Sequence, residues 1–424
     1  MRKPQALVLL ALLVAACAVG PNYQRPSAPV PPAYKELSGA QEAGGPEWKP
    51  AQPSDAVLRG KWWEVFGDPE LNALEDQVVI ANQNLAAAEA QFRGARALAR
   101  QARAALFPTV TAGAAVTRSS GVARTTTPTP PGAPPPTVNA YSASAELLWE
   151  LDLFGGIRRS VEAGVASAQA SAADLESTRL ALQAELADDY FTLHGLDAQK
   201  QLLDTTVAGY QTALQLTENR YKQGVVSGVD VAQAQTQLET TRAQATDLRI
   251  ARAQLEHAIA VLVGKPPADV SLPPAPIHVN PPQIPPALPG ELLERRPDIA
   301  AAERRVAAAN AQRGVAVAGY FPALSLAGSG GYGASTLTHL FTLPNRFWSL
   351  GPALAETIFD GGRRRAVKEQ AEANWEAAVA SYRESVLDAF QEVEDNLAAL
   401  RILGQEAREQ DAAVAAADHT LALA

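Results

Sequence analysis

The sequence has few sulfur-containing residues and no long hydrophobic run after its first 16 residues. Its 424 residues include one Cys and one Met, which excludes a disulfide scaffold and offers no ligand set for a soft metal. With 45 acidic and 36 basic side chains the net charge is −9, and the absence of a basic stripe argues against nucleic-acid binding. No later stretch approaches the roughly 18 apolar residues that a spanning helix needs. If this chain crosses a membrane, we expect a β-barrel.

Signals of catalysis and of cofactor binding are also missing. No G-x-S-x-G motif marks a nucleophile. Residues 328–333 match G-x-G-x-x-G, but no clear helix follows and no acid lies about 20 residues on, so we interpret these glycines as a loop at the outer end of a strand pair. We therefore predict no enzyme, no cofactor and no metal site. The histidines also lack a paired ligand spacing: His194, His257, His278, His339 and His419.

The N-terminus has the pattern of an export signal that ends at the single cysteine. Arg2 and Lys3 precede an apolar run, so we predict a signal peptide over residues 1–16. The Leu-Val-Ala-Ala before Cys17 resembles a bacterial lipobox, in which the cysteine carries lipid such as palmitate, and the alanine that follows favours the outer membrane. The alternative is a buried or incidental thiol. We expect a lipid-anchored, extended segment over 17–67.

Proline-free tracts predict long helices. These tracts are rich in Ala, Leu, Gln, Glu and Arg, which favour helix formation, whereas the proline clusters between them cannot be helical. A seven-residue apolar repeat predicts a coiled-coil-like helix over 156–222, about 100 Å long at 1.5 Å per residue. A returning helix over 229–263 follows, and then a Pro-rich linker over 266–297. No compact globular domain needs so long a helix.

Four other segments carry Thr, Val and aromatic residues in approximate alternation, which is typical of strands. Together, 107–154 and 320–359 hold 11 of the 25 aromatic residues. Aromatic girdles of a membrane barrel would produce such a bias, although a soluble sheet would give a weaker one. The predicted strands are 106–119, 139–154, 320–332 and 347–359. A second long helix is predicted to begin at about 362.

The two halves of the chain repeat the same order of elements. The L-F-P-T-V at 106–110 matches the Y-F-P-A-L at 320–324. We therefore predict a first repeat over 68–265 and a second over 298–424, each reading helix, strand, strand, long helix. Four strands cannot close a barrel, and lipid-facing edges cannot stay unpaired, so oligomerisation is required.

These motifs, taken together, resemble the TolC-type outer membrane efflux family, in particular its NodT-like lipoprotein branch. The resemblance implies a mainly α fold with a membrane β-barrel portion. In it a homotrimer forms a 12-stranded barrel above a periplasmic helical tunnel. It further implies that the protein is a passive exit duct, lipid-anchored in the outer membrane and embedded in its lipid. An inner-membrane transporter would deliver substrates to this duct through a periplasmic adaptor. The motifs that carry it are 17–23, Trp62-Trp63, 66–71, Arg220-Tyr221 with Gly224 and Ser227, 262–264, 292–298, 319–322 and 359–363.

By this resemblance the hairpin after the first long helix is the tip that meets the adaptor. Its predicted contact residues are Arg220, Tyr221, Gly224, Ser227 and Gly228. Asp230 is a candidate for a ring of carboxylates at the aperture, or else it caps the returning helix.

The repeat offset of about 207 would place a second hairpin near residue 427, so we expect the second repeat to be truncated at its C-terminus. Alternative functions are a structural or adhesive coiled-coil outer membrane lipoprotein and the adaptor itself. We expect the two strand pairs and their aromatic bias to favour the duct.

Overall fold

The computed structural model describes residues 18–31, 34–36, 60–120, 137–275 and 295–423. They form two compact units. The first gathers residues up to Pro29 with 93–170 and 301–389, and the second gathers the remainder. Each unit thus takes segments from both sequence repeats. In the described ranges, no helix combines the length and the apolarity that crossing a membrane requires.

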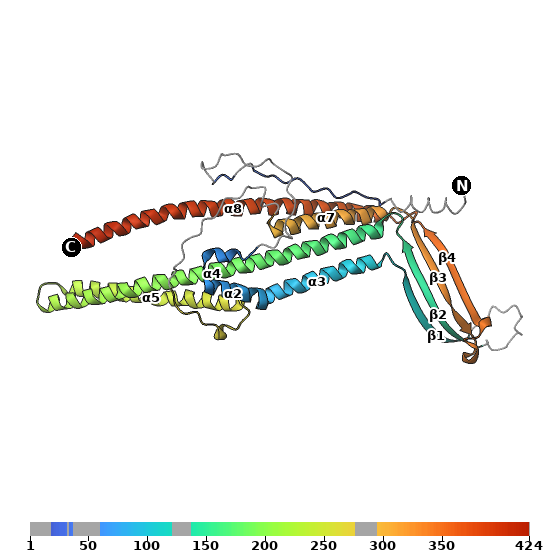
Figure 1. Cartoon of the computed structure of the whole chain (residues 1–424), viewed down its shortest axis with the longest axis horizontal. Coiled ribbons are helices and arrows are strands. Elements are labelled where there is room, and N and C mark those ends of the chain that lie inside the picture. The colour runs from blue at the N-terminus through green and yellow to red at the C-terminus, as the bar shows by residue number, and fades with distance from the viewer. Residues whose placement is uncertain (1–17, 32–33, 37–59, 121–136, 276–294, 424) are drawn as a thin grey trace. The chain divides into compact units, whose positions relative to one another are not determined.

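The first unit contains a four-stranded antiparallel sheet in the order β1-β2-β3-β4 (Figure 1). The first strand begins three residues later than predicted, because Phe107 and Pro108 belong to the turn after a helix. The last strand ends four residues before its predicted end at 359. The strands are β1 (Thr109–Ser120), β2 (Thr137–Leu151), β3 (Ala323–Ala334) and β4 (Arg346–Ala355).

The two faces of this sheet differ in polarity. Strand registers and the alternation of side chains place exposed Val116, Trp348 and Leu350 on one face. The opposite face carries Glu146 and a row of serines and threonines. Such a sheet suits an apolar environment on one side and water on the other.

The glycine-rich run 328–333 lies inside β3, not in the loop that the sequence suggested. A Cβ on Gly331 would lie 2.3 Å from the main-chain oxygen of Ala143 on the neighbouring strand. These strands approach too closely for a side chain there, which explains at least this glycine by packing.

The helices are long and mostly uninterrupted. α4 (Gly156–Lys222) has the bounds that the seven-residue repeat predicts, and α5 (Gly228–Leu262) returns after a short turn. A 3-10 helix, η1 (Trp62–Phe66), lies in the segment that was predicted to be extended. The other elements are α2 (Pro69–Ala81), α3 (Gln83–Ala104), η2 (Pro267–Asp269), α7 (Pro297–Ala318), η3 (Leu337–His339), η4 (Leu343–Asn345) and α8 (Arg363–Leu423).

The second unit has the larger hydrophobic core. Leu71, Leu186 and Ile259, from α2, α4 and α5, are fully buried there. Asp68 caps α2 and also accepts a hydrogen bond from the Tyr190 hydroxyl at 2.8 Å. These contacts fix the short helix against the long ones.

Candidate functional site

Two arginine-carboxylate pairs stabilise the starts of the long helices that follow the strand pairs. The Asp152 carboxylate accepts hydrogen bonds from the main-chain N–H of Arg158 at 2.8 Å and from its Nε at 3.1 Å. Asp360 does the same for Arg364, at 3.1 and 2.8 Å. A positive charge near a helix N-terminus is unfavourable to the helix dipole, and the carboxylate beside each arginine offsets that effect. The sequence alone did not identify these partners.

These hydrogen bonds also set the charge of Asp360. Partial desolvation acts to raise its pKa, but hydrogen bonds from the main chain and side chain of Arg364 and from Gly362 hold the pKa below its usual value. The aspartate therefore stays ionised at neutral pH.

The N-terminal segment crosses the first unit beside α4 and α7. The guanidinium of Arg159, whose side chain is 6% exposed, bonds the Asn22 side chain at 2.9 Å and the main-chain oxygens of Val19 and Gly20 at 3.3 Å. A Cβ on Gly20 would lie 2.6 Å from the Cα of Gly314, so the segment lies directly on α7. Cys17 itself lies outside the described residues.

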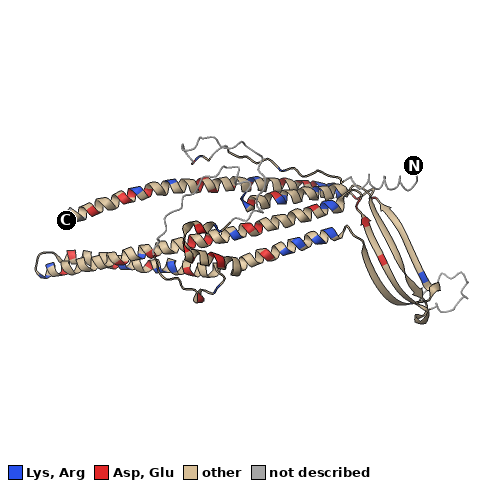
Figure 2. Ribbon diagram, in the orientation of Figure 1, with Lys and Arg blue, Asp and Glu red and all other residues tan. Residues whose placement is uncertain are grey.

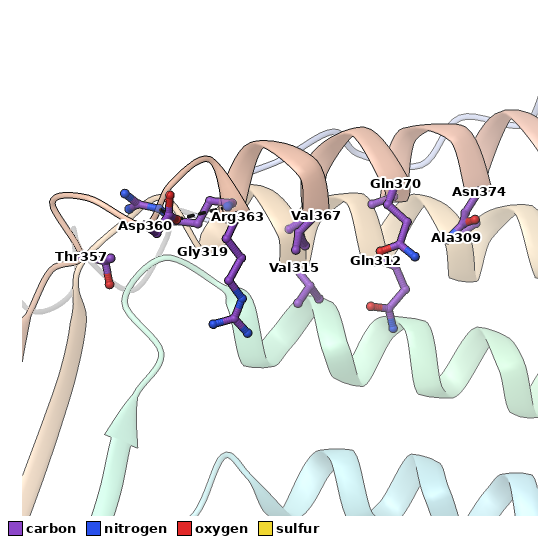
Figure 3. Close-up of a pocket in the computed structure, with 13 residues that line it drawn as sticks. Ala309, Gln312, Val315, Gly319, Thr357, Asp360, Arg363, Val367, Gln370 and Asn374 are labelled. Carbon is purple, nitrogen blue, oxygen red and sulfur yellow. Dashed lines mark hydrogen bonds and ion pairs between the residues drawn. The ribbon is translucent and has the colours of Figure 1, made fainter.

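A cleft of about 720 Å³ separates α7 from the first turns of α8. Val367 and Gln370 of α8 face Val315 and Gln312 of α7 across it, and Arg363 extends beside them (Figure 3). The lining is mostly small and polar, and it contains no nucleophile paired with a base. The cleft is a groove between the two helices.

The predicted tip is the turn between α4 and α5, in the second unit (Figure 1). Gly224 has φ +76°, and its N–H bonds the Tyr221 oxygen at 2.9 Å. The Val225 N–H reaches the Arg220 oxygen at 3.0 Å. This is a left-handed helix end that favours glycine. The ring of Tyr221 lies 3.7 Å from the position of a Cβ on Gly228, so the two predicted residues meet.

The returning helix begins with a capping box. Ser227 is its N-cap, and the Asp230 carboxylate accepts from the Ser227 N–H and Oγ, each at 2.8 Å. These two hydrogen bonds lower the pKa of Asp230. Of the two roles foreseen for Asp230, the capping role is the one this geometry displays.

The tip exposes three large apolar or aromatic side chains. Tyr221, Val225 and Val229 are 53%, 68% and 64% exposed. Exposed apolar side chains that gather at one turn are a feature that interaction surfaces share. The two valines were not among the predicted contact residues, although their sequence already placed them beside the turn.

The sequence analysis also missed a buried network in the second unit. Asp197, whose side chain is 4% exposed, pairs with Arg252 at 2.6 Å and accepts the Ala275 N–H at 3.1 Å. Arg252 donates to the Leu272 oxygen at 2.7 Å. The network fixes the chain after α5 against both helices. Spacing gives no signal for it, because the partners are 55 residues apart in sequence.

Comparison with known proteins places this geometry among channel proteins. The family model described as outer membrane efflux protein matches residues 74–265 and 288–424. The toluene efflux pump outer membrane protein TtgC of Pseudomonas putida is 32% identical over 411 residues, which cover 96% of this chain and 82% of that protein. Outer membrane protein OprJ of Pseudomonas aeruginosa is 33% identical over 432 residues, covering 100% and 87%. The solved outer-membrane channel OprN superposes with a TM-score of 0.78 at 34% identity, covering 90% of this chain and 82% of that one.

Proposed function

The chain belongs to the outer membrane efflux protein family, and on that premise we propose that three copies form the passive exit duct of a tripartite pump. The family's role, as an outer membrane component of efflux pumps, applies to this chain. The finer proposal concerns assembly and partners. An inner-membrane transporter would supply the energy and a periplasmic adaptor would connect it to the duct. The protein then has no chemistry to perform beyond opening and closing.

The observation that supports a trimer is the open sheet, whose two edge strands each have a neighbour on one side only within the described part of the chain. Strands β1 and β4 are its edges, and one face is apolar. Unpaired main-chain N–H and C=O groups are costly in lipid, so each edge needs a strand from another copy. Three copies would supply twelve strands and close the sheet into a barrel. A structural or adhesive coiled-coil protein would have no use for such a sheet.

Conductance tests the duct directly. We expect the purified full chain to migrate as a trimer, in a heat-sensitive way, and to produce ion conductance in planar bilayers. A monomeric protein without conductance would contradict the proposal.

The hairpin tip is the proposed adaptor contact. Its exposed Tyr221, Val225 and Val229 would dock on an apolar surface of the adaptor, with Arg220, Gly224, Ser227 and Gly228 shaping the turn. Replacing Tyr221 and Val225 by serine should weaken adaptor pull-down while conductance is retained. Leu202→Ser is a matched control, because Leu202 is 67% exposed on α4 away from the turn. Equal loss in the control would refute a specific tip contact.

Asp230 has a second proposed role at this tip. Since hydrogen bonds lower its pKa, the carboxylate is charged at neutral pH. Three copies would place three such charges around the aperture and attract cations. Asp230→Asn should reduce the preference of the open duct for cations, measured as a shift in reversal potential. An unchanged reversal potential would leave Asp230 with its capping role alone.

Lipidation of Cys17 is the proposed anchor, as in the NodT-like branch. It is supported by the neighbouring residues: the Val19 N–H bonds the Phe154 oxygen at 3.0 Å, just after β2. This hydrogen bond holds Val19, two residues after Cys17 in the sequence, near the end of β2. Cys17→Ser should abolish incorporation of labelled palmitate. Label that persists in this variant would contradict the assignment.

A further inference from the structure

The apolar face of the sheet carries two arginines at the end where β1 finishes and β4 begins. Arg118 is in the third-to-last position of β1 and Arg346 is the first residue of β4. Registers place Arg118 on the face of Val116, and Arg346 on the face of Trp348 and Leu350, which is the same face. Both arginines are exposed.

No carboxylate of the strand pairs is available to neutralise these arginines. The strands carry few charges (Figure 2). Neither 109–145 nor 323–355 contains any Asp or Glu, and Glu146 and Glu150 of β2 point to the opposite face. Arginine on a lipid-facing surface is costly near the midplane and tolerated only near an interface. Two such cations at one rim therefore call for an anion from outside the chain.

The stagger of the strands in the sheet determines which residues of β4 would lie beside β1 of the next copy. Thr109 lies in the same row as Gly351, four residues short of the end of β4, and Arg346 lies in the row of Ala114, six residues short of the end of β1. A closed barrel needs such a stagger. The offset between β1 and β4, which are three strands apart, is four to six residues. Extended to the fourth neighbour, which is β1 of the next copy, the offset becomes roughly five to eight residues. Arg346 then lies beside the C-terminal end of β1 in the next copy, close to its Arg118.

We propose that Arg118 of one copy and Arg346 of its neighbour bind the phosphate groups of a membrane glycolipid at the outer rim of the barrel. Guanidinium groups bind phosphate through paired hydrogen bonds, and their long side chains reach a headgroup from either edge. The acyl chains of the same lipid would cover the apolar face below. The inference rests on the proposed trimer, because one copy alone keeps the arginines on opposite edges.

Lipid binding to the purified trimer tests this proposal. The probes are bisphosphorylated lipid A and the same lipid after enzymatic removal of its phosphates, measured by native mass spectrometry. We expect the natural trimer to prefer the phosphorylated lipid by about tenfold or more, since each hydrogen bond to a charged group contributes roughly tenfold to a binding constant. The preference should fall to near unity in Arg118→Ser with Arg346→Ser, and be partly kept with lysine at both sites.

The matched control replaces two exposed arginines of helices α5 and α8, Arg249→Ser with Arg408→Ser. It should retain the preference. Equal binding of both lipids by the natural trimer, or loss of the preference in the control, overturns the proposal. Displacement of the lipid by millimolar inorganic phosphate would also overturn it, because the site would then hold free phosphate. Failure to form any trimer would instead refute the proposed assembly.

Discussion

At the scale of single residues, a carboxyl group in the core of the second unit stands out. Glu75 of α2 is fully buried, and neither carboxylate oxygen has a hydrogen-bond partner. Burial, together with the charge of Asp76, raises the pKa of Glu75 to about 8. The side chain is therefore mostly protonated at neutral pH, where an exposed glutamate would be charged.

This raised pKa predicts a stability that declines with rising pH. The unfolded chain ionises Glu75 near its ordinary pKa of 4.5, whereas the folded protein does so near 8. The contribution of Glu75 to stability is therefore fully present below pH 4.5 and falls between pH 4.5 and about 8 by on the order of 1 kcal/mol per pH unit. Glu75→Gln should remove this decline. Melting temperatures of both proteins at pH 5 and pH 8 would measure it, with Asp76→Asn as the control for the adjacent charge. A parallel decline in the glutamine variant would contradict the prediction.

The buried pair of Asp197 and Arg252 predicts a large effect from one substitution. Asp197→Ala removes the nearer of the two carboxylates that Arg252 contacts and leaves only Glu256, at 3.2 Å, which costs about 3 kcal/mol. Glu239→Ala breaks the exposed pair with Arg242, whose length is 2.9 Å, and should cost less than about 1 kcal/mol. Denaturant midpoints of the two variants measure the difference. Similar midpoints would show that the buried network adds little.

At the scale of elements, periodicity predicted the helices better than the contacts that start and end them. The seven-residue repeat gives the bounds of α4 because a long helix imposes one spacing throughout. The carboxylate partners of Arg158 and Arg364 escaped detection since they lie six residues before one arginine and four before the other. Both repeats therefore contain the aspartate–arginine pair, but the two aspartates do not occupy equivalent positions in the repeat. Glu75 was equally hidden, because burial of a lone acid leaves no sequence pattern.

The turn between α4 and α5 predicts opposite effects for two glycine substitutions. Gly224→Ala places a side chain at φ +76° and should destabilise the hairpin by roughly 1 kcal/mol. Gly209→Ala, at an exposed site inside α4 with nothing near its Cβ, should stabilise the helix by about as much. Hydrogen exchange of the hairpin amides should quicken in the first variant only. Faster exchange in both would mean that Gly209 has a packing role.

At the scale of the whole molecule, the register of the sheet predicts which strands meet between copies. Leu350 shares a row with Val110 of its own sheet, and the same stagger of roughly five to eight residues puts it beside positions about 115 to 118 of the next copy. Val116 lies on the same face as Leu350 and within that range. Within one chain the two residues are three strand spacings apart across the sheet, about 14 Å, and their rows lie a further six residues apart along the strands, about 20 Å, which is too far for a disulfide.

Cysteines at these two positions should therefore join copies and never close within one. In a Cys17→Ser background the chain has no other thiol, so Val116→Cys with Leu350→Cys should give covalent dimers and trimers on a non-reducing gel after export. Each single variant should stay monomeric there. Ala112→Cys with Ala145→Cys, which face each other in one sheet, should close within the chain and control for oxidation. Monomers alone from the first pair, with the control oxidised, would show that β4 and β1 of neighbouring copies do not pair in this register.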